Sequence, residues 1–537
     1  MKKLRNTIAC GVAALALLAT GLTSCTGDFD NINTSKDKPT PEDVDRDNAW
    51  AAFIQTMQRN VFAEGANAYQ LADNLLGDSY AGYFGQAQDW DSGSNSTCYA
   101  FPTAKWKDEP YKQAYNNVMS SWNILRQKVD SASVVFALGE VVKVQAMHRV
   151  TDIYGPLPYT AFGKMSSGLP YDSQETVYRT FIKELDHALK TLKAAYEADS
   201  GAKPIADFDV VFDSDLEKWI RFANSLKLRL AMRIVYTDFT TDDGRTPQQL
   251  AEEAVSSELG VIEDNSGNAM YTGFGKDGNP FYVCFFSYKS GAGDHRVAAD
   301  IASFMNGYAD PRRASYFNES AFAAGGYAGL RNGIQIPDDE RINNFSRYNV
   351  TASTSLMWMN ASEVAFLRAE GALRGWAMGG DARSFYEEGI RLSFERCGVA
   401  DQLTAYMAST ALPGSYEDPA FGYSCSNQST VTIPWNDGAA FEENLERIIT
   451  QKWIANFPLG TEAWADYRRT GYPRLFPVVV NNNPDITNLQ LGARRMTYPL
   501  EEYEANGETI RAAVDQWLGG QDKMSTRLWW DCNPRIR

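Results

Sequence analysis

The chain has 537 residues, of which 44% are apolar, and it carries a formal net charge of −16 at pH 7. This acidic excess argues against nucleic-acid binding, because the phosphate backbone of nucleic acids attracts clustered lysine and arginine. It also argues against electrostatic adsorption to anionic lipid, so any membrane attachment must come from another source.

The first 25 residues have the three regions of an export signal. A basic segment at residues 2–5 precedes an apolar run at residues 8–22, which is shorter than the roughly 20 residues of a membrane-spanning helix. The sequence Leu-Thr-Ser-Cys follows, ending at Cys25, and it resembles a bacterial lipobox. We therefore predict a lipoprotein signal peptide over residues 1–24 and a lipidated Cys25.

The residues after Cys25 are polar, acidic and proline-containing, which is typical of a segment that buries too little apolar surface to order itself. We predict a flexible tether over residues 25–45. Asp28 and Asp30 in this tether resemble the acidic export signals of surface lipoproteins. No low-complexity linker follows, so residues 46–537 are predicted to form a single domain.

Helical periodicity dominates this predicted domain. Asp172 and Glu175 have the spacing of a capping box, and apolar residues then recur every three or four positions from Val177 to Tyr196. Two further capping boxes are Ser214 with Glu217, before a predicted helix at 216–236, and Asn360 with Glu363, before one at 361–377. Other predicted helices cover residues 47–62, 112–128, 134–150 and 444–457.

Strand-like alternation is scarce, so the predicted fold is mostly α. Helix pairs of this kind suit a degenerate tetratricopeptide-like solenoid, in which each pair buries its apolar face on the next. The long polar loops between them exceed about 15 residues, a length that is often functional. These loops lie at residues 77–110, 263–296 and 412–440.

The first two loops are rich in aromatic residues and hold the candidate ligand-binding side chains. Sugar rings have apolar C–H faces that stack on aromatic planes, while neighbouring amides and carboxylates hydrogen-bond their hydroxyl groups. Trp90 is the preferred candidate because Gln88 and Asp89 beside it are polar. Tyr83, Trp106 and Tyr282 are further candidates. The alternative is that these rings pin the loops to the helices, which is the usual role of buried aromatic residues.

The sequence offers no catalytic motif. His148, His187 and His295 are dispersed, and no H-E-x-x-H, G-x-S-x-G or Walker A pattern occurs. A G-x-G-x-x-G pattern occupies 273–278, but Asn279-Pro280 follows where a dinucleotide-binding helix should begin. We therefore predict that the protein is not an enzyme and has no cofactor.

Neither the clustered charges nor the cysteines of the sequence are interpreted as a functional site. Arg368 and Glu370, and Arg468 and Arg469 beside Asp466, are interpreted as buried or interfacial ion pairs rather than an acid–base site. Five cysteines remain after Cys25, an odd number without C-x-x-C spacing, so neither a disulfide framework nor a zinc site is predicted. One bridge stays open as an alternative. The cysteines are Cys98, Cys284, Cys397, Cys425 and Cys532.

Eight segments spread over nearly the whole chain resemble the SusD/RagB family of nutrient-binding outer-membrane lipoproteins. In chain order they are DIYGPLPYTAF (152–162), LPYDSQETVYRTFIKELDHAL (169–189), NSLKLRLAMRI (224–234), ADPRRASYF (309–317), NASEVAFLRAEGALRGW (360–376), ITQKWIANFPLGTEAWADYRRTGYPRL (449–475), RRMTYPLEEYEAN (494–506) and STRLWWD (525–531).

The resemblance implies an all-α, SusD-like fold, with tetratricopeptide-like helix pairs in a right-handed superhelical scaffold and long irregular ligand-binding loops. It also implies a lipid-anchored protein at the outer-membrane surface. Such a protein would deliver oligosaccharides, or oligopeptides in the RagB branch, to a SusC-like TonB-dependent transporter. A surface glycan hydrolase and a purely structural scaffold remain alternatives.

Overall fold

The computed structural model describes residues 50–90, 95–101, 103, 105–164, 168–276, 278–322 and 326–536. The predicted signal peptide (1–24), the lipidation site Cys25 and the tether (25–45) lie outside the described residues. The helices and strands below belong to a compact unit of residues 53–537, except that α4 begins two residues earlier. No described helix combines the length and apolarity needed to cross a membrane.

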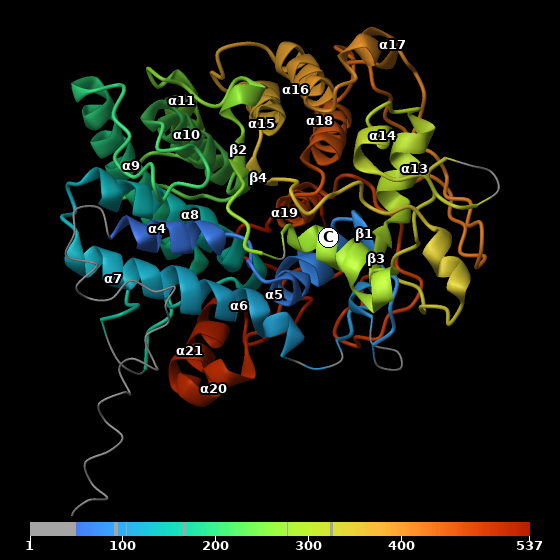
Figure 1. Ribbon diagram of the computed structural model, residues 1–537, viewed down its shortest axis with the longest axis horizontal. Coiled ribbons are helices and arrows are strands. Elements are labelled where there is room, and N and C mark those ends of the chain that lie inside the picture. Colours follow the sequence, from blue (N-terminus) through green and yellow to red (C-terminus); the bar gives the residue numbers. More distant parts are fainter. Residues whose placement is uncertain are drawn as a thin grey trace, which may run out of the picture. The chain divides into compact units, whose positions relative to one another are not determined.

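Helices build the fold (Figure 1). The longer ones are α8 (Val134–Tyr154), α9 (Gln174–Ala198), α10 (Leu216–Arg233), α11 (Pro247–Ser256), α15 (Ala361–Leu373), α16 (Ala382–Arg396), α18 (Phe441–Asn456), α19 (Gly460–Thr470) and α21 (Gly507–Trp517). The shorter α-helices are α4 (Ala51–Arg59), α5 (Ala66–Tyr69), α6 (Glu109–Gln113), α7 (Ser120–Lys128), α12 (Pro280–Tyr282), α13 (Ala299–Gly307), α14 (Arg313–Tyr316), α17 (Leu403–Met407) and α20 (Leu500–Ala505).

Short π- and 3-10 helices join several of these elements. The π-helices are η1 (Gln70–Asp78), η4 (Ala114–Met119) and η6 (Val283–Ser287). The 3-10 helices are η2 (Ser96–Cys98), η3 (Trp106–Asp108), η5 (Asn265–Gly267), η7 (Lys289–Gly291), η8 (Glu340–Asn344) and η9 (Ala400–Gln402).

Consecutive helices pack against one another in pairs. Helix α8 packs on α9, α9 on α10, and α10 on α11, while α15 packs on both α16 and α18. Figure 1 shows the first group on the left of the molecule and the second along its top. The arrangement confirms the prediction of an all-α fold built from helix pairs.

Strands are few and short, as the sequence predicted. Strand β1 (Phe84–Gln86) pairs antiparallel with β3 (His295–Val297), so that Phe84 lies opposite Val297. Strand β2 (Ala269–Tyr271) pairs antiparallel with β4 (Leu356–Met359). The β1–β3 ribbon matters for the site, because it joins the two aromatic loops of the sequence.

Two of the three predicted helix caps are shifted by one residue. The Asn360 side chain accepts from the Glu363 N–H, as predicted, but Ser173 rather than Asp172 caps α9, and Asp215 rather than Ser214 caps α10. Asp172 instead accepts hydrogen bonds from the N–H groups of residues 159 and 160, and the Ser214 hydroxyl accepts from that of residue 205. Both side chains hold the loop before the helix, a role that sequence spacing does not separate from capping.

Buried ion pairs tie the helices together. Arg229 of α10 makes two parallel hydrogen bonds of 2.8 Å to the Glu363 carboxylate of α15. Arg469 of α19 binds Glu370 of α15 in the same bidentate way, at 2.5 and 2.8 Å. Arg469 also contacts Asp466 at 3.1 Å, which confirms the structural interpretation of these residues. Both bidentate pairs are almost fully buried.

Two arginines of the predicted ion pairs have other partners. Arg368 pairs with Glu263 at 2.8 Å near the surface and not with Glu370. Arg468 donates to the backbone carbonyls of Asp152 and Arg494, at 2.6 and 2.8 Å. In this structure Arg468 therefore holds backbone segments together, while Arg469 holds a carboxylate.

The Arg229→Met substitution is expected to lower the free energy of unfolding by about 3–5 kcal/mol, because it leaves Glu363 buried without its bidentate partner. The matched control is Arg383→Met, which breaks an exposed pair with Glu387 within α16. The control should change stability by less than about 0.5 kcal/mol. Urea unfolding measures both values, and similar losses in the two variants would contradict the importance of the buried pair.

Candidate functional site

The β1–β3 ribbon holds the start of the first aromatic loop. The Gln86 side chain donates to the Gln88 carbonyl at 2.7 Å and accepts from the Ser96 N–H at 3.1 Å. The Ala87 N–H donates to the Asp294 carbonyl at 2.7 Å. These bonds attach residues 86–88 to the ribbon and to η2, so the loop leaves the ribbon in a defined direction.

Four predicted site residues come together where this loop leaves the ribbon. The rings of Trp90 and Trp106 meet edge to face, with centroids 5.2 Å apart and planes at 76°. Both side chains are half-buried. Gln88 and Asp89 are half-buried beside Trp90, and the Gln88 amide donates to the Asp89 carbonyl at 3.0 Å. The structure thus combines two indole rings with polar neighbours.

His295 lies next to this pair in β3. Its ring centroid is 6.2 Å from that of Trp90 and 6.1 Å from that of Phe285. The side chain is fully buried, and neither ring nitrogen hydrogen-bonds to a described residue. Burial, with a smaller contribution from Arg296, lowers the pKa of His295 to about 3. The ring is therefore neutral at pH 7 and supports Trp90 as an apolar surface.

Tyr282 belongs to a second aromatic pair on α12 and η6. Its ring stacks on Phe286 at 5.6 Å with an interplanar angle of 27°, and both residues are half-buried. The Arg347 guanidinium lies 5.1 Å from the Phe286 ring centroid. Helix η6 packs against β3, so this pair flanks the same ribbon as Trp90. Arg347 was missed by sequence reasoning, because no spacing rule connects it to Phe286.

Tyr83 lies in the interior. Its side chain is fully buried, its ring stacks on Trp453 at 5.6 Å, and its hydroxyl donates to the Trp453 carbonyl at 2.5 Å. In this structure Tyr83 presents no surface to a ligand and anchors the β1 segment to α18. Tyr83 therefore has the alternative role considered for the aromatic residues of the loops, which is to hold a loop against the helices.

The glycine-rich segment at 273–278 differs from the prediction in one detail. A short helix, α12, does begin at Pro280, where Asn279 acts as its N-cap. Proline is well tolerated at the first position of a helix, because its missing N–H would have no helical partner. The strand before this segment, β2, pairs antiparallel with β4. A dinucleotide-binding unit requires a parallel crossover, so that interpretation still fails.

The three histidines lie at separate places in the described part of the chain. No cluster of three or more histidine, cysteine or acidic residues there is arranged to hold a metal ion. His148 is paired with Glu462 at 2.8 Å, and His187 with Glu140 at 2.6 Å, at separate places. The five cysteines of the described residues are free.

Comparison with known proteins identifies the family. The model of the family described as SusD-like, SusD and RagB outer membrane lipoprotein, matches residues 31–531. The chain belongs to the SusD-like family. Its members are outer membrane lipoproteins, and the match confirms the resemblance seen in the sequence. A search of curated proteins gives no match.

Solved SusD homologues have the same fold. A SusD homologue from Bacteroides uniformis is 41% identical, covers 91% of this chain and 100% of its own, and superposes with a TM-score of 0.84. One from Bacteroides ovatus is 38% identical, with coverages of 90% and 99% and a TM-score of 0.83. A chitin-binding SusD homologue from Flavobacterium johnsoniae is 37% identical, with coverages of 90% and 99% and a TM-score of 0.85.

The burial of His295 predicts acid sensitivity. Its pKa is about 3 in the folded protein and about 6.5 in an unfolded chain, so the unfolded chain binds more protons between these values. The contribution of neutral His295 to the free energy of unfolding is therefore fully present above pH 6.5 and declines as the pH falls toward 3. From pH 7 to pH 5 the expected loss is about 2 kcal/mol.

Urea unfolding at pH 7 and pH 5 tests this expectation in the wild type and in His295→Gln, which does not titrate. The variant should lose about 2 kcal/mol less stability than the wild type over this interval. Equal losses in the two proteins would show that His295 does not account for the acid sensitivity.

Proposed function

We propose that this SusD-like protein captures oligosaccharides at the aromatic surface of Trp90 and Trp106, with Tyr282 as a flanking ring. The observation that carries the proposal is the pair of half-buried indoles beside Gln88 and Asp89. Two ring planes at 76° present flat apolar faces in two directions, and sugar rings stack on such faces. The chitin-binding homologue from Flavobacterium johnsoniae supports a glycan ligand.

Tyr83 takes part in this proposal only indirectly. Because its ring is buried against Trp453, its contribution is to fix the strand from which the Trp90 loop departs. Tyr282 and Phe286 form a separate, half-buried stacked pair on α12 and η6, and η6 packs against β3. An oligomeric ligand long enough to reach both pairs would contact both aromatic surfaces.

Delivery to a transporter completes the proposed role. The family consists of outer membrane lipoproteins, which supports a lipid anchor at Cys25, exposure at the cell surface and a SusC-like TonB-dependent transporter as partner. The proposed mechanism is passive: the protein holds its ligand over the transporter and releases it when the complex changes state, which requires only a difference in affinity between the two states. An oligopeptide ligand is the second candidate, because the family description includes RagB.

The Trp90→Ala substitution is expected to weaken oligosaccharide binding at least tenfold, since the loss of a stacking plane costs roughly 1.4 kcal/mol or more. Calorimetric titration of the mature protein with separate pools of oligosaccharides and oligopeptides measures the effect. Trp435→Ala is the matched control, because Trp435 is also half-buried and lies in the third polar loop, next to Tyr386.

The outcomes separate the candidates. Heat with sugars that is lost in Trp90→Ala and kept in Trp435→Ala supports the proposed site, while heat with peptides alone moves the function to the second candidate. Shorter sugar chains appearing after long incubation would instead show a hydrolase. The absence of saturable binding to either pool would contradict the proposal.

The Cys25→Ala substitution is expected to move the protein from the membrane fraction to the soluble fraction, because acyl chains supply the only proposed attachment. Fractionation followed by immunoblotting measures the distribution, and protease treatment of intact cells tests surface exposure of the wild type. Retention of Cys25→Ala in the membrane fraction would refute the lipid-anchor proposal.

A further inference from the structure

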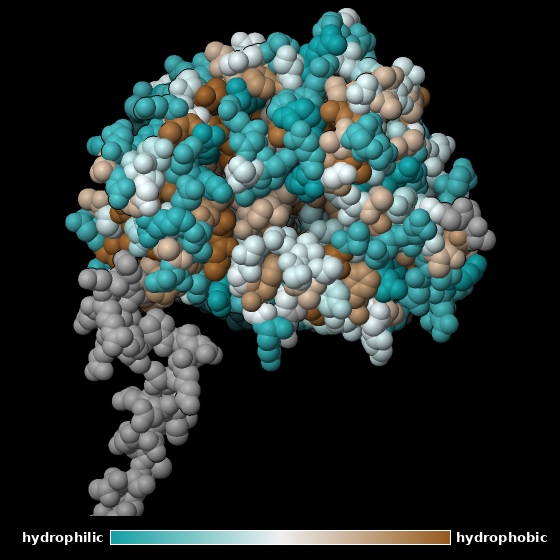
Figure 2. All heavy atoms as spheres, turned by 45° about the horizontal axis from the view of Figure 1, so that its top comes forward, coloured by the Kyte–Doolittle hydropathy of each residue, from teal (hydrophilic) through white to brown (hydrophobic). Residues whose placement is uncertain are grey.

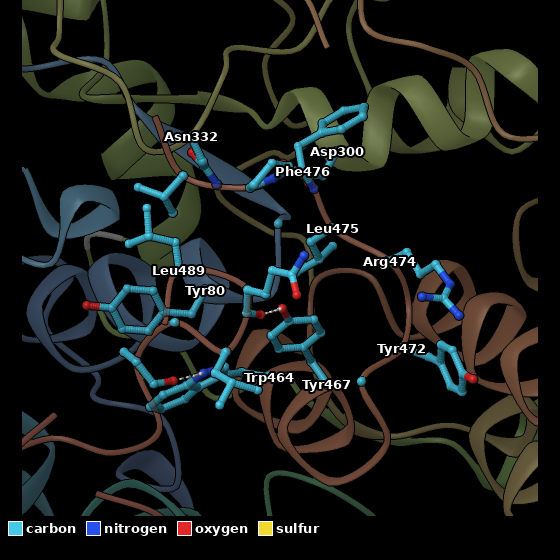
Figure 3. Close-up of a pocket in the computed structure, with 18 of the residues that line it drawn as sticks. Tyr80, Asp300, Asn332, Trp464, Tyr467, Tyr472, Arg474, Leu475, Phe476 and Leu489 are labelled. Carbon is cyan, nitrogen blue, oxygen red and sulfur yellow. Dashed lines mark hydrogen bonds between the residues drawn. The ribbon is translucent and has the colours of Figure 1, made fainter. Parts of the chain in front are cut away.

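A cavity of about 360 Å³ lies beside α19 (Figure 3). It is formed by α19, by residues 472–478 after it, by residues 489–494, and by Tyr80 and Tyr99 from the segments on either side of β1. None of Trp90, Trp106 and Tyr282 lines it. Its volume lies within the range of roughly 300–1,000 Å³ that is typical of small-molecule sites.

The walls of this α19 cavity combine aromatic and aliphatic side chains with polar groups. Figure 3 shows Tyr80, Trp464, Tyr467 and Leu489 on one side of the cavity, opposite Phe476 and Asp300. The Tyr80 ring packs on Trp464 at 5.1 Å. Tyr80, Tyr467 and Leu489 are half-buried, so they present surface to the cavity without being free in solvent.

The walls are held in place by hydrogen bonds. The Trp464 indole donates to the Ala493 carbonyl at 3.2 Å, and the Tyr467 hydroxyl donates to the Gln490 carbonyl at 2.5 Å. These two bonds fix the 489–494 segment against α19. The cavity is therefore preformed, which reduces the entropy lost when a ligand binds.

One carboxylate in the cavity lacks an ionic partner. Asp300 is only 2% exposed, and the charge of Arg331, which forms no ion pair with it within 4 Å among the described residues, lowers the pKa of its carboxyl less than burial raises it. One of its oxygens accepts from the Phe476 N–H at 2.7 Å, and burial raises its pKa. A buried carboxylate with so few hydrogen bonds is costly. A ligand that donates a hydrogen bond to Asp300 would recover part of this cost.

The other charges of the cavity disfavour a cationic ligand. Each of them is already in an ion pair: Arg474 with Glu446, Arg494 with Asp531, and Arg535 with Glu442. The lining holds three arginines against the two carboxylates Asp300 and Glu442, so no negative excess attracts a cation. An uncharged ligand with an apolar ring face and hydroxyl donors fits this combination.

We propose that the α19 cavity is a second carbohydrate site, which takes a short saccharide of one or two rings. The sugar ring packs between Tyr80, Tyr467 and Leu489, and a hydroxyl donates to Asp300. The cavity volume of about 360 Å³ limits the size of the ligand, in contrast to the aromatic surface around Trp90. The inference depends on the proposed function only for the chemical class of the ligand.

The test compares short and long sugars on the mature protein, purified in a detergent without a sugar headgroup. The short probes are glucose, N-acetylglucosamine, maltose, cellobiose and chitobiose, and the long ones are the corresponding oligosaccharides. Leu489→Trp fills the cavity from a half-buried wall position. Val479→Trp is the matched control, because Val479 is 55% exposed and is not part of the lining.

Saturation-transfer NMR and calorimetry are expected to show short-sugar binding to the wild type, to Trp90→Ala and to Val479→Trp. Leu489→Trp should lose at least tenfold in affinity for short sugars and keep its affinity for long ones. Asp300→Asn should lose about fivefold or more, because the neutral amide is a weaker acceptor for a ligand hydroxyl. Thermal unfolding of each variant shows that these losses do not come from misfolding.

Other results would overturn the inference. If the wild type binds long sugars but no short ones, the second site is wrong while the proposed function stands. If it binds short sugars and not long ones, and only Leu489→Trp removes that binding, the proposed function fails and the cavity stands. Loss of short-sugar binding in Trp90→Ala but not in Leu489→Trp would show a single site. Binding of tetramethylammonium in place of sugars would refute the saccharide assignment.

Discussion

The buried, bidentate ion pair between Arg229 and Glu363 constrains how the two groups of paired helices meet. It joins α10 to α15, helices from two groups that are far apart in the sequence. A nonpolar contact tolerates sliding, but two parallel hydrogen bonds fix both distance and orientation. Removing the two charges from water offsets much of their attraction, so such a pair adds little net stability. Its main effect is to fix the relative position of the two helices. Arg469 and Glu370 form a second bidentate ion pair, which joins α19 to α15.

This scaffold explains how long loops keep a defined shape without regular structure. The β1–β3 ribbon is only three residues long on each strand, too short to be stable alone. Buried rings around it supply the missing contacts: Tyr83 on Trp453, and Phe84 against Phe285 and Phe457. The same loops then expose Trp90 and Tyr282 in part. Some aromatic residues of a loop are thus buried and anchor it, while others are partly exposed and can contact a ligand. The elements packed around each ring determine which role it has.

That division marks the limit of what the sequence predicts. Helix positions, the Asn360 cap and the role of Arg469 follow from periodicity, capping chemistry and charge, all of which act over short distances or through family fingerprints. Tyr83 and Trp90 were both candidates, because both are aromatic residues in a polar loop, and only the polar neighbours of Trp90 favoured it. Packing against α18 and Phe457 buries Tyr83, whereas Trp90 lies against Trp106 and His295. Long-range contacts of this kind have no local signature.

The α19 cavity is a second feature that the sequence did not predict. Trp464 and Tyr467 lie in the segment 449–475, one of the eight segments that together resemble the family. They are architectural, since each holds the 489–494 segment by a hydrogen bond. The 489–494 segment held in this way lies across a cavity from Asp300 and Phe476. Residues that build a scaffold can therefore line a site, and a shared fingerprint does not by itself separate the two roles.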